Sequence, residues 1–367
     1  MAIEGRNIRV LVVDDSAVYR TLISTNLSSK AGIQVVGAAY DAFDAQEKIA
    51  SLKPDIVTLD VEMPKMSGIE LTKKLMSTAP LPIILVSSAN INVFDALQAG
   101  ALDFVKKPDA SRSVSPEAFI DELVSKIKVA SIAKISNHLL ARPVAETVHA
   151  AEISTATNSV NSILGKSPSD FSDSICNSAL IALGASTGGT EAIFEVLKRL
   201  PAKIPPLLIV QHMPPVFTKL YAERLNKLCA MNVKEAQDND VVVPGQVYIA
   251  PGDCQMRLIK VAGTYKLSCK GTEKVSGHCP SVDALFDSVA KESSRKNVGI
   301  ILTGMGKDGA SGLLEMKNKG AYTLGESQES CVVYGMPMVA QNIGAVMIQA
   351  SNKEIPNLLI KHLNTLG

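Results

Sequence analysis

The sequence lacks an excess of charge of either sign. Its 367 residues contain 37 Lys and Arg against 36 Asp and Glu, which gives a formal net charge of +1 at pH 7. Proteins that bind nucleic acid through bulk charge carry a basic excess. Neither a basic cluster nor a helix-turn-helix spacing follows Ile175. We therefore expect no nucleic-acid partner.

Paired cysteine motifs and a secretory signal are also missing. The six cysteines are scattered without a C-x-x-C pair, and no apolar secretory segment lies near Met1. Cysteines in such a pattern are typical of reduced thiols inside the cell. We therefore expect a cytoplasmic protein.

A long apolar run that could cross a membrane is absent as well. The segment 332–350 has no formal charge, but it contains Pro337, Gln341, Asn342 and two glycines. A spanning helix needs ~20 predominantly apolar residues. The segment predicts a buried helix followed by a strand, and we expect no membrane insertion.

Short apolar runs rich in Val, Ile and Leu alternate with amphipathic segments in two parts of the chain. The runs lie at residues 8–13, 33–38, 55–60, 82–87, 103–106, 179–184, 206–211, 247–250 and 298–304. This alternation is typical of parallel sheets with helices on both faces. Alternating apolar residues at 254–270, around Ala262 and Gly263, predict an inserted β-hairpin.

The composition divides the chain into three parts. Residues 131–175 are rich in Ser, Ala, Thr, Asn and Pro, which is typical of a flexible linker. We expect one domain at residues 1–130 and a second at residues 176–367. The predicted fold class is α/β, with two doubly wound, mostly parallel sheets.

Polar side chains follow the strands of the first predicted sheet. Asp14 and Asp15 come directly after the first strand, and Asp60 ends the third. Because the carboxyl ends of parallel strands meet at one edge, these acids are expected to lie close together and to hold Mg²⁺. Ser87 ends the fourth strand and Lys107 follows the fifth. A hydroxyl and an ammonium at the same edge favour an added phosphate on one aspartate.

Residues 8–130 resemble the receiver domain of two-component response regulators. The resemblance lies in the order of these five side chains, in the D-x-E-M-P turn at 60–64 and in Gly68. It implies a flavodoxin-like fold, phosphorylation by a histidine kinase, and Mg²⁺ as cofactor of that step. The implied roles are phospho-acceptor for Asp60, metal ligands for Asp14, Asp15, Asp60 and the backbone at Glu62, switch residues for Ser87 and Phe104, and phosphoryl contact for Lys107.

A possible nucleophile lies in the second part of the chain. Ser186 occurs in G-A-S-T-G-G (184–189), between a predicted strand and a predicted helix. Glycines at such a turn allow a backbone that projects the hydroxyl, and the helix N-terminus offers amides to an oxyanion. By itself this motif also fits a Gly-rich turn whose serine only caps a helix.

A serine nucleophile needs a base and an acid at the same sheet edge. Among five histidines, His212 ends a predicted strand and is the preferred base. His278, in a loop, lines the site or caps a helix. Asp308, in T-G-M-G-K-D-G (303–309), is the preferred acid, which would orient His212. Asp253 and Asp283 are weaker candidates for that role.

The glycines of the same loop support a different interpretation. Gly304 to Gly309 match G-x-G-x-x-G, and Glu326 lies about 20 residues further on, where an acid could bind a ribose. A receiver-linked module that binds a dinucleotide without covalent chemistry is therefore the alternative function. Asp308 disfavours it, because its carboxylate would oppose a pyrophosphate, whereas Lys307 partly offsets that objection.

Residues 178–367 resemble the catalytic domain of the chemotaxis protein-glutamate methylesterases. The matching pieces are G-A-S-T-G-G, V-Q-H-M-P, Y-I-A-P-G-D, P-S-V-D-x-L-F, L-T-G-M-G-x-D-G and E-S-C-V-V-Y-G-M-P. The resemblance implies a Rossmann-like α/β domain with Ser186, His212 and Asp308 as catalytic triad. It also places Thr187 and Met305 near the oxyanion.

The resemblance of the whole chain implies a phosphorylation-activated hydrolase. Its expected substrates are glutamate γ-methyl esters, and glutamine side chains, on the cytoplasmic helices of chemoreceptors. No cofactor is expected for the esterase. We further hypothesise that the unphosphorylated receiver covers the catalytic edge and that Phe104 and Ser87 relay the change when Asp60 is phosphorylated.

Overall fold

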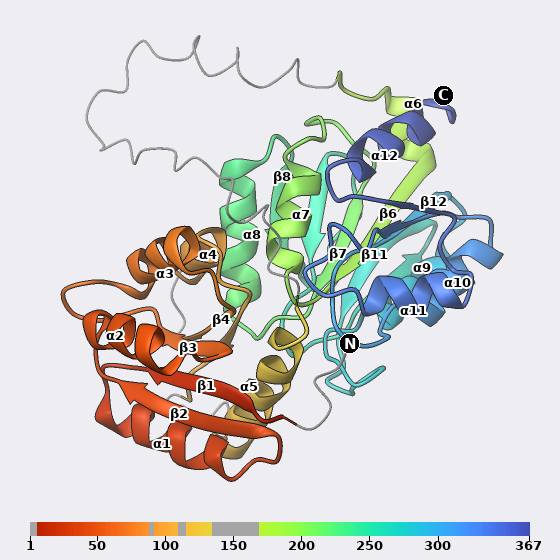
Figure 1. The fold of residues 1–367 in the computed structure, drawn as a ribbon. Coiled ribbons are helices and arrows are strands. Elements are labelled where there is room, and N and C mark those ends of the chain that lie inside the picture. Colours follow the sequence, from red (N-terminus) through yellow and green to blue (C-terminus); the bar gives the residue numbers. More distant parts are fainter. Residues whose placement is uncertain (1–5, 88–91, 109–114, 134–168) are drawn as a thin grey trace.

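The computed structural model describes residues 6–87, 92–108, 115–133 and 169–367. Within these ranges the chain forms two parallel sheets and a two-stranded hairpin. Figure 1 shows the N-terminal part, in red and orange, beside the larger C-terminal part, in green and blue. The predicted α/β fold class is confirmed.

The described residues of the N-terminal part form five strands and five helices. These are β1 (Ile8–Val13), α1 (Ala17–Ser28), β2 (Ile33–Ala39), α2 (Ala42–Leu52), β3 (Ile56–Asp60), α3 (Gly68–Thr78), β4 (Ile83–Ser87), α4 (Asn92–Gln98), β5 (Asp103–Lys106) and α5 (Pro116–Ala130). The strands pair in parallel in the flavodoxin-like order β2-β1-β3-β4-β5. Strands β3 and β4 are buried along their whole length, as expected where helices cover both faces.

The C-terminal part contains nine strands and seven helices among the described residues. These are α6 (Asp173–Ser178), β6 (Ala179–Ala185), α7 (Gly189–Leu197), β7 (Leu207–Gln211), α8 (Phe217–Leu228), β8 (Asn232–Glu235), β9 (Gln246–Ile249), β10 (Met256–Val261), β11 (Thr264–Cys269), α9 (Val282–Glu292), β12 (Lys296–Ile301), α10 (Ala310–Asn318), β13 (Tyr322–Glu326), α11 (Met336–Asn342), β14 (Ile348–Ala350) and α12 (Ile355–Asn364).

Seven of these strands form one sheet in the order β14-β13-β12-β6-β7-β9-β8, with parallel pairing throughout. Strands β6 and β12 are neighbours at the centre of the sheet. The strand that follows β6 in the chain, β7, lies on one side of this pair, and the strand that follows β12, β13, lies on the other side. The carboxyl ends of β6 and β12 therefore flank a topological switch point, where α/β proteins place their sites.

Two smaller predictions also agree with the structure. Strands β10 and β11 form the inserted hairpin, and Ala262 and Gly263 both have positive φ, as a tight two-residue turn requires. The uncharged segment 332–350 holds helix α11 and strand β14. In the described ranges, no helix has both the length and the apolar character needed to cross a bilayer.

The predicted linker, residues 131–175, falls largely on residues 134–168, which lie outside the described residues. Helix α6 already begins at Asp173 and packs beside β6. The domain bounds at 130 and 176 stay a prediction.

The two parts meet through aromatic side chains. Phe104 of β5 lies 4.5 Å, centroid to centroid, from Phe217 of α8, and Phe94 of α4 stacks on Tyr221 of α8 at 5.4 Å. One cluster of buried apolar side chains therefore continues from the first part into the second. Figure 1 shows α4 and α8 side by side at this contact.

Candidate active site

Strand register brings Ser186 and His212 to one edge of the C-terminal sheet. Ala185 pairs with Gln211 at the carboxyl ends of β6 and β7, so Ser186 and His212 are the next residues on two neighbouring strands. The N–H of His212 donates to the Ala185 carbonyl at 3.2 Å. The structure thus places the predicted nucleophile beside the predicted base.

The turn that carries Ser186 is held by its backbone. The N–H of Ser186 donates to the Thr303 carbonyl at 3.0 Å, and its carbonyl accepts the N–H of Gly189 at 2.7 Å and the amide of Gln211 at 2.9 Å. Gly188 has a φ of 78°, and a Cβ there would lie 2.6 Å from Val332. Glycine is therefore required for both the left-handed backbone and the close approach.

Asp308 fixes the imidazole of His212. Its Oδ2 lies 2.7 Å from Nε2 of His212, and the carboxylate also accepts the hydroxyl of Ser281 at 2.7 Å and the N–H groups of Val282 and Asp283 at 2.8 and 2.9 Å. Burial alone would raise the pKa of Asp308, but these bonds lower the pKa below its ordinary value. Asp308 is therefore an ionised acceptor that selects the Nε2–H tautomer of His212.

This tautomer leaves Nδ1 of His212 as the basic nitrogen. Nδ1 is buried and has no hydrogen-bond partner among the described residues. Because Ser186 ends the adjacent strand, Nδ1 is the atom able to receive its proton. The geometry supports a Ser-His-Asp arrangement in which Nε2 of His212 pairs with Asp308 and Nδ1 is left for the serine on the adjacent strand.

His278 lines this site rather than capping a helix. Its ring stacks on the ring of His212 at 3.8 Å between centroids, with an interplanar angle of 11°. Burial and the neighbouring His212 lower the pKa of His278 to about 4. The second imidazole is therefore neutral near pH 7 and shields one face of His212. The sequence signal for this contact was only a glycine-flanked histidine in a loop.

The weaker acid candidates have other surroundings. Asp283 accepts the hydroxyl of Ser276 at 2.6 Å and the N–H of Gly312 at 2.8 Å. Asp253 lies in a turn with a φ of 55°. Neither makes a recorded hydrogen bond to His212, whereas Asp308 does.

The two residues predicted near the oxyanion differ in their environment. Thr187 is buried, and its hydroxyl donates to Oδ2 of Asp103 at 2.7 Å. Met305 is 43% exposed.

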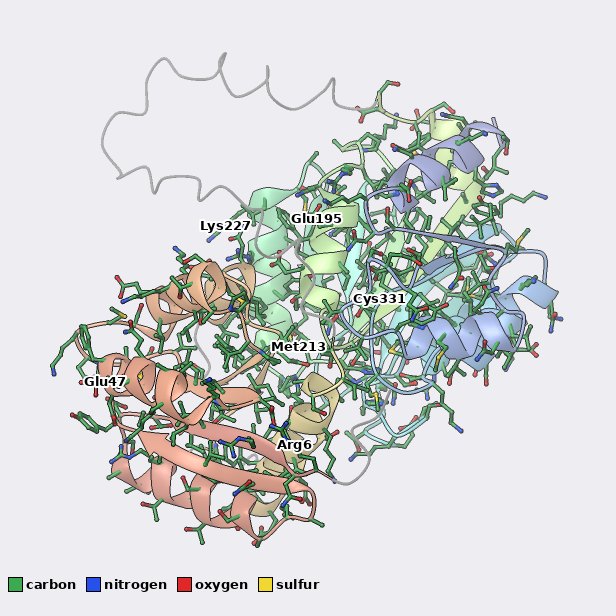
Figure 2. All side chains as sticks on the ribbon, in the orientation of Figure 1. Arg6, Glu47, Glu195, Met213, Lys227 and Cys331 are labelled. Atoms are coloured by element: carbon green, nitrogen blue, oxygen red, sulfur yellow. The ribbon has the colours of Figure 1, made fainter. Side chains whose placement is uncertain are left out.

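Met213, which follows His212, lies where the N-terminal and C-terminal parts meet (Figure 2). The N-terminal part therefore contacts the catalytic edge directly.

The predicted acid cluster of the N-terminal sheet is also assembled. Oxygen atoms of Asp14, Asp15 and Asp60 all lie within 4.8 Å of one another. The ammonium of Lys107 lies 2.6 Å from Asp60 and 2.9 Å from Asp14. Burial raises the pKa of Asp14 and of Asp60. Three clustered carboxylates suit a hard cation such as Mg²⁺, because oxygen atoms are its preferred ligands.

The remaining receiver residues surround this cluster. Ser87 is fully buried, and its carbonyl accepts the N–H of Lys107 at 2.8 Å. The N–H of Glu62 donates to Asp60 at 3.3 Å. Phe104 is buried against Phe217 of α8, so the predicted switch aromatic lies at the contact between the two parts.

Comparisons with known proteins agree with this division. The model of the CheB methylesterase family matches residues 181–359, and the model of the response regulator receiver domain matches residues 10–115. A protein of Syntrophomonas wolfei named protein-glutamate methylesterase/protein-glutamine glutaminase 2 is 48% identical over 361 residues, which are 98% of this chain and 99% of that protein. This chain belongs to the CheB methylesterase family.

A further relative of similar length and a solved catalytic domain also match. The protein-glutamate methylesterase/protein-glutamine glutaminase of Syntrophotalea carbinolica is 44% identical over 343 residues, 92% of this chain and 93% of its own length. The crystal structure of the Thermotoga maritima CheB methylesterase catalytic domain has 38% sequence identity and a TM-score of 0.49, and it covers 50% of this chain and 97% of that chain.

The dinucleotide interpretation is not supported for this CheB family member. Glu326, the acid expected on a ribose, is fully buried and accepts the N–H of Thr303 at 2.8 Å. The carboxylate of Asp308 is hydrogen-bonded to His212 and is not directed at a ligand phosphate. The glycines of the loop allow close backbone contacts instead, since a Cβ at Gly304 would lie 2.7 Å from that of Ser186.

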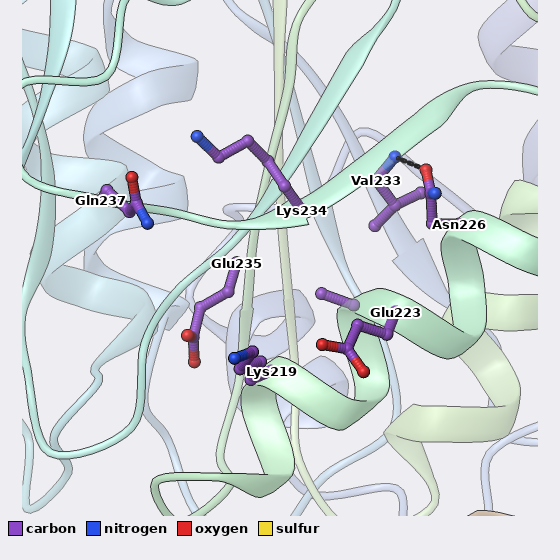
Figure 3. A pocket seen from close by; sticks show the side chains of 8 residues that line it. Lys219, Glu223, Asn226, Val233, Lys234, Glu235 and Gln237 are labelled. Carbon is purple, nitrogen blue, oxygen red and sulfur yellow. Dashed lines mark hydrogen bonds between the residues drawn. The ribbon is translucent and has the colours of Figure 1, made fainter.

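A separate pocket of ≈310 Å³ lies between α8 and the edge strand β8. Figure 3 shows Lys219, Glu223 and Asn226 on one side and Lys234 and Glu235 on the other. Its lining contains none of the predicted site residues, so it is distinct from the candidate active site of this CheB protein.

Proposed function

We propose that the chain is a phosphorylation-activated protein-glutamate methylesterase that also deamidates glutamine side chains. The observation that carries this proposal is the His212–Asp308 pair beside Ser186 at the switch point of the sheet. The activity itself is that named for relatives of nearly the same length. We further propose chemoreceptor helices as substrates, a histidine kinase as phosphodonor and a cytoplasmic location.

Acylation begins when Oγ of Ser186 attacks the γ-carbonyl carbon of a glutamate methyl ester. Nδ1 of His212 takes the hydroxyl proton, and Asp308 stabilises the resulting imidazolium without accepting its proton. The carbonyl electron pair moves to oxygen, where amides at the start of α7 and groups near Thr187 and Met305 are placed to stabilise it.

Collapse of the tetrahedral intermediate breaks the bond to the methoxy group. His212 returns its proton, and methanol leaves. Water then attacks the acyl-enzyme while His212 acts as base again, which releases the glutamate carboxylate and restores Ser186. For a glutamine side chain the same steps release ammonia.

The contacts between the two parts support control by the receiver. Asp103 holds the hydroxyl of Thr187, the residue after the nucleophile, and is itself paired with Lys126 at 2.6 Å. Val332, which approaches Gly188, packs against the apolar cluster under α5. We propose from these contacts that the unphosphorylated receiver covers the Ser186 turn. Phosphate on Asp60 is expected to release it through Ser87 and Phe104.

Weakening the contact between the parts is expected to raise the basal rate. The guanidinium of Arg224, on α8, lies 2.5 Å from Asp95 and 2.8 Å from Gln98 of α4, and Arg224 is not a member of the proposed triad. Arg224→Glu should increase esterase activity without phosphodonor by roughly fivefold, since a partly exposed pair is worth about 1 kcal/mol. Adding Asp95→Lys should reverse the increase.

The matched control for this prediction is Lys227→Glu, an equal charge change at an exposed position of the same helix (Figure 2). The basal rate of this variant should stay within twofold of the unchanged protein's rate, because surface substitutions that break no specific contact usually change the free energy by about 0.5 kcal/mol or less. Equal rates for Arg224→Glu and the unchanged protein would show that this contact does not restrain the esterase.

Removal of Mg²⁺ should distinguish phosphorylation of the receiver from ester hydrolysis. Asp14, Asp15, Asp60 and the carbonyl of Glu62 are the residues proposed to hold Mg²⁺, which neutralises charge during phosphoryl transfer. A chelator should abolish activation by a small acyl phosphate, and added Mg²⁺ should restore it. The basal esterase rate should not change. A basal rate that falls with chelation would contradict an esterase that needs no metal.

The direct test of the proposed function is methanol release from a methyl-esterified chemoreceptor fragment. The full chain should release methanol in proportion to the glutamate carboxylates formed. Ammonia release from an unmodified glutamine-containing fragment tests the second activity. No methanol release with or without phosphodonor would reject the proposal.

A further inference from the structure

Thr303 connects the nucleophile turn to the interior of the C-terminal part. Its carbonyl accepts the N–H of Ser186 at 3.0 Å, and its hydroxyl donates to the Thr187 carbonyl at 3.0 Å. The same hydroxyl accepts the N–H of Val333 at 2.9 Å. The position of Thr303 therefore fixes the backbone of the two residues on which the chemistry is proposed to depend.

Glu326 holds Thr303 from the buried side. The N–H of Thr303 donates to Oε2 of Glu326 at 2.8 Å, and the other carboxyl oxygen lies 2.9 Å from the hydroxyl of Ser330. Glu326 ends β13, the neighbour of β12, and has 0% solvent exposure. Without this carboxyl group, the N–H of Thr303 would be buried and unpaired, which is costly in free energy.

The partners of this carboxyl group are uncharged. Its hydrogen-bond partners are the N–H of Thr303 and the hydroxyl of Ser330, the thiol of Cys331 donates to the backbone carbonyl of Glu326, and no cation of the described ranges shifts its pKa. Glu329, in the same loop, carries charge of the same sign and faces Cys331. Burial therefore disfavours the carboxylate and raises the pKa of Glu326 to about 7. Cys331, labelled in Figure 2, also has its pKa raised by burial and stays a neutral thiol.

We propose that Glu326 is a positioning residue for the esterase and that its neutral form holds the Ser186 turn in the working arrangement. The inference rests on the proposed function. In the neutral acid, one carboxyl oxygen of Glu326 accepts the N–H of Thr303, and the carboxyl O–H donates to the hydroxyl oxygen of Ser330. The hydroxyl proton of Ser330 is then directed to the Ser327 carbonyl, 3.4 Å away. Ionisation puts an uncompensated charge in the interior, draws the side chain toward water and loosens Thr303.

The test compares pH profiles of the full-length protein and two variants. In Glu326→Gln the amide reproduces both hydrogen bonds of the neutral acid at every pH. Its kcat should stay near the unchanged protein's value at about pH 6 and exceed it by roughly fivefold or more at about pH 8.5. Glu326→Ala should lower kcat by roughly tenfold at both pH values with little change in KM, because the Thr303 N–H is left unpaired.

Glu329→Gln is the matched control, because it makes the same substitution at an exposed position three residues away. Its pH profile should follow that of the unchanged protein. A Glu326→Gln profile that superimposes on the unchanged protein's, or a folded Glu326→Gln that is inactive at every pH, would overturn the proposal. Absence of methanol release from the unchanged protein would instead be a failure of the proposed function.

A second measurement does not depend on esterase activity. The unfolded chain ionises Glu326 near its ordinary pKa, whereas the folded protein keeps the proton to a higher pH. Stability to urea should therefore fall as pH rises from about 4.5 to about 7 and level off above it. Glu326→Gln should remove this part of the slope, and an unchanged slope would show that Glu326 does not hold the buried proton.

Discussion

Replacing Ser186 by alanine is expected to lower the esterase rate by roughly 10⁴–10⁶-fold, the range found when a serine nucleophile is removed from a triad. The loss is this large because Nδ1 of His212 and the carboxylate of Asp308 contribute to the reaction only by activating the hydroxyl of Ser186. The measurement is methanol release by the full chain with a small acyl phosphate present, so that the receiver does not limit the rate.

The control for this prediction is Ser311→Ala, the same substitution at an exposed position of α10. It should keep the activity of the unchanged protein. Because the Ser186 side chain does not hold the turn, which is fixed by backbone bonds to Thr303 and Gly189, Ser186→Ala should unfold at the same urea concentration. A stable Ser186→Ala protein with full activity would end the triad assignment.

The second large effect is expected from phosphorylation. If the receiver leaves the catalytic edge open in about 1% of molecules and phosphorylation makes the open form dominant, the rate rises about 100-fold. A shift from 1:99 to 99:1 requires ~5.5 kcal/mol of difference between the two states. We expect the bond of Lys107 to Asp60 and the contact of Phe104 with Phe217 to differ between the two states.

Asp60→Asn should remove this activation, because the amide cannot accept the phosphoryl group. Methanol release with and without a small acyl phosphate measures the effect in both proteins. Asp55→Asn is a suitable control and should keep the activation, because this aspartate lies just before β3 and pairs with Arg6. Activation that persists in Asp60→Asn, or equal rates in the unchanged protein, would reject the switch.

Much of the fold could be predicted because buried parallel strands have largely apolar sequences. The runs at β1, β3, β4, β6, β7 and β12 are of this kind. Strands β8 and β13 were not predicted. β8 is N-V-K-E at one edge of the sheet, and an edge strand needs no continuous apolar pattern.

The candidate site was predictable residue by residue but not in its geometry. Glycines around Ser186 and the strand-end position of His212 are local signals in the sequence. Which nitrogen of His212 faces Asp308 depends on the loop at Ser281, which binds the carboxylate from 27 residues away in the chain. The stacking of His278 also depends on that tertiary arrangement.

The contact between the two parts had no signal in the sequence. Asp103 and Thr187 are separated by 84 residues, and their hydrogen bond exists only because the receiver is docked against the turn. The role proposed for Glu326 was hidden for a similar reason. An acid at the end of a strand appears accessible in the sequence, whereas the fold buries it completely.

The most direct test of the triad is covalent labelling of the full chain with a fluorophosphonate, followed by mass spectrometry of its peptides. We expect a single modified residue, Ser186, in the unchanged protein, and labelling that is strongly slowed in His212→Ala, which lacks the base. Labelling of another residue, or rapid labelling of Ser186 without His212, would contradict a nucleophile activated by Nδ1 of that histidine.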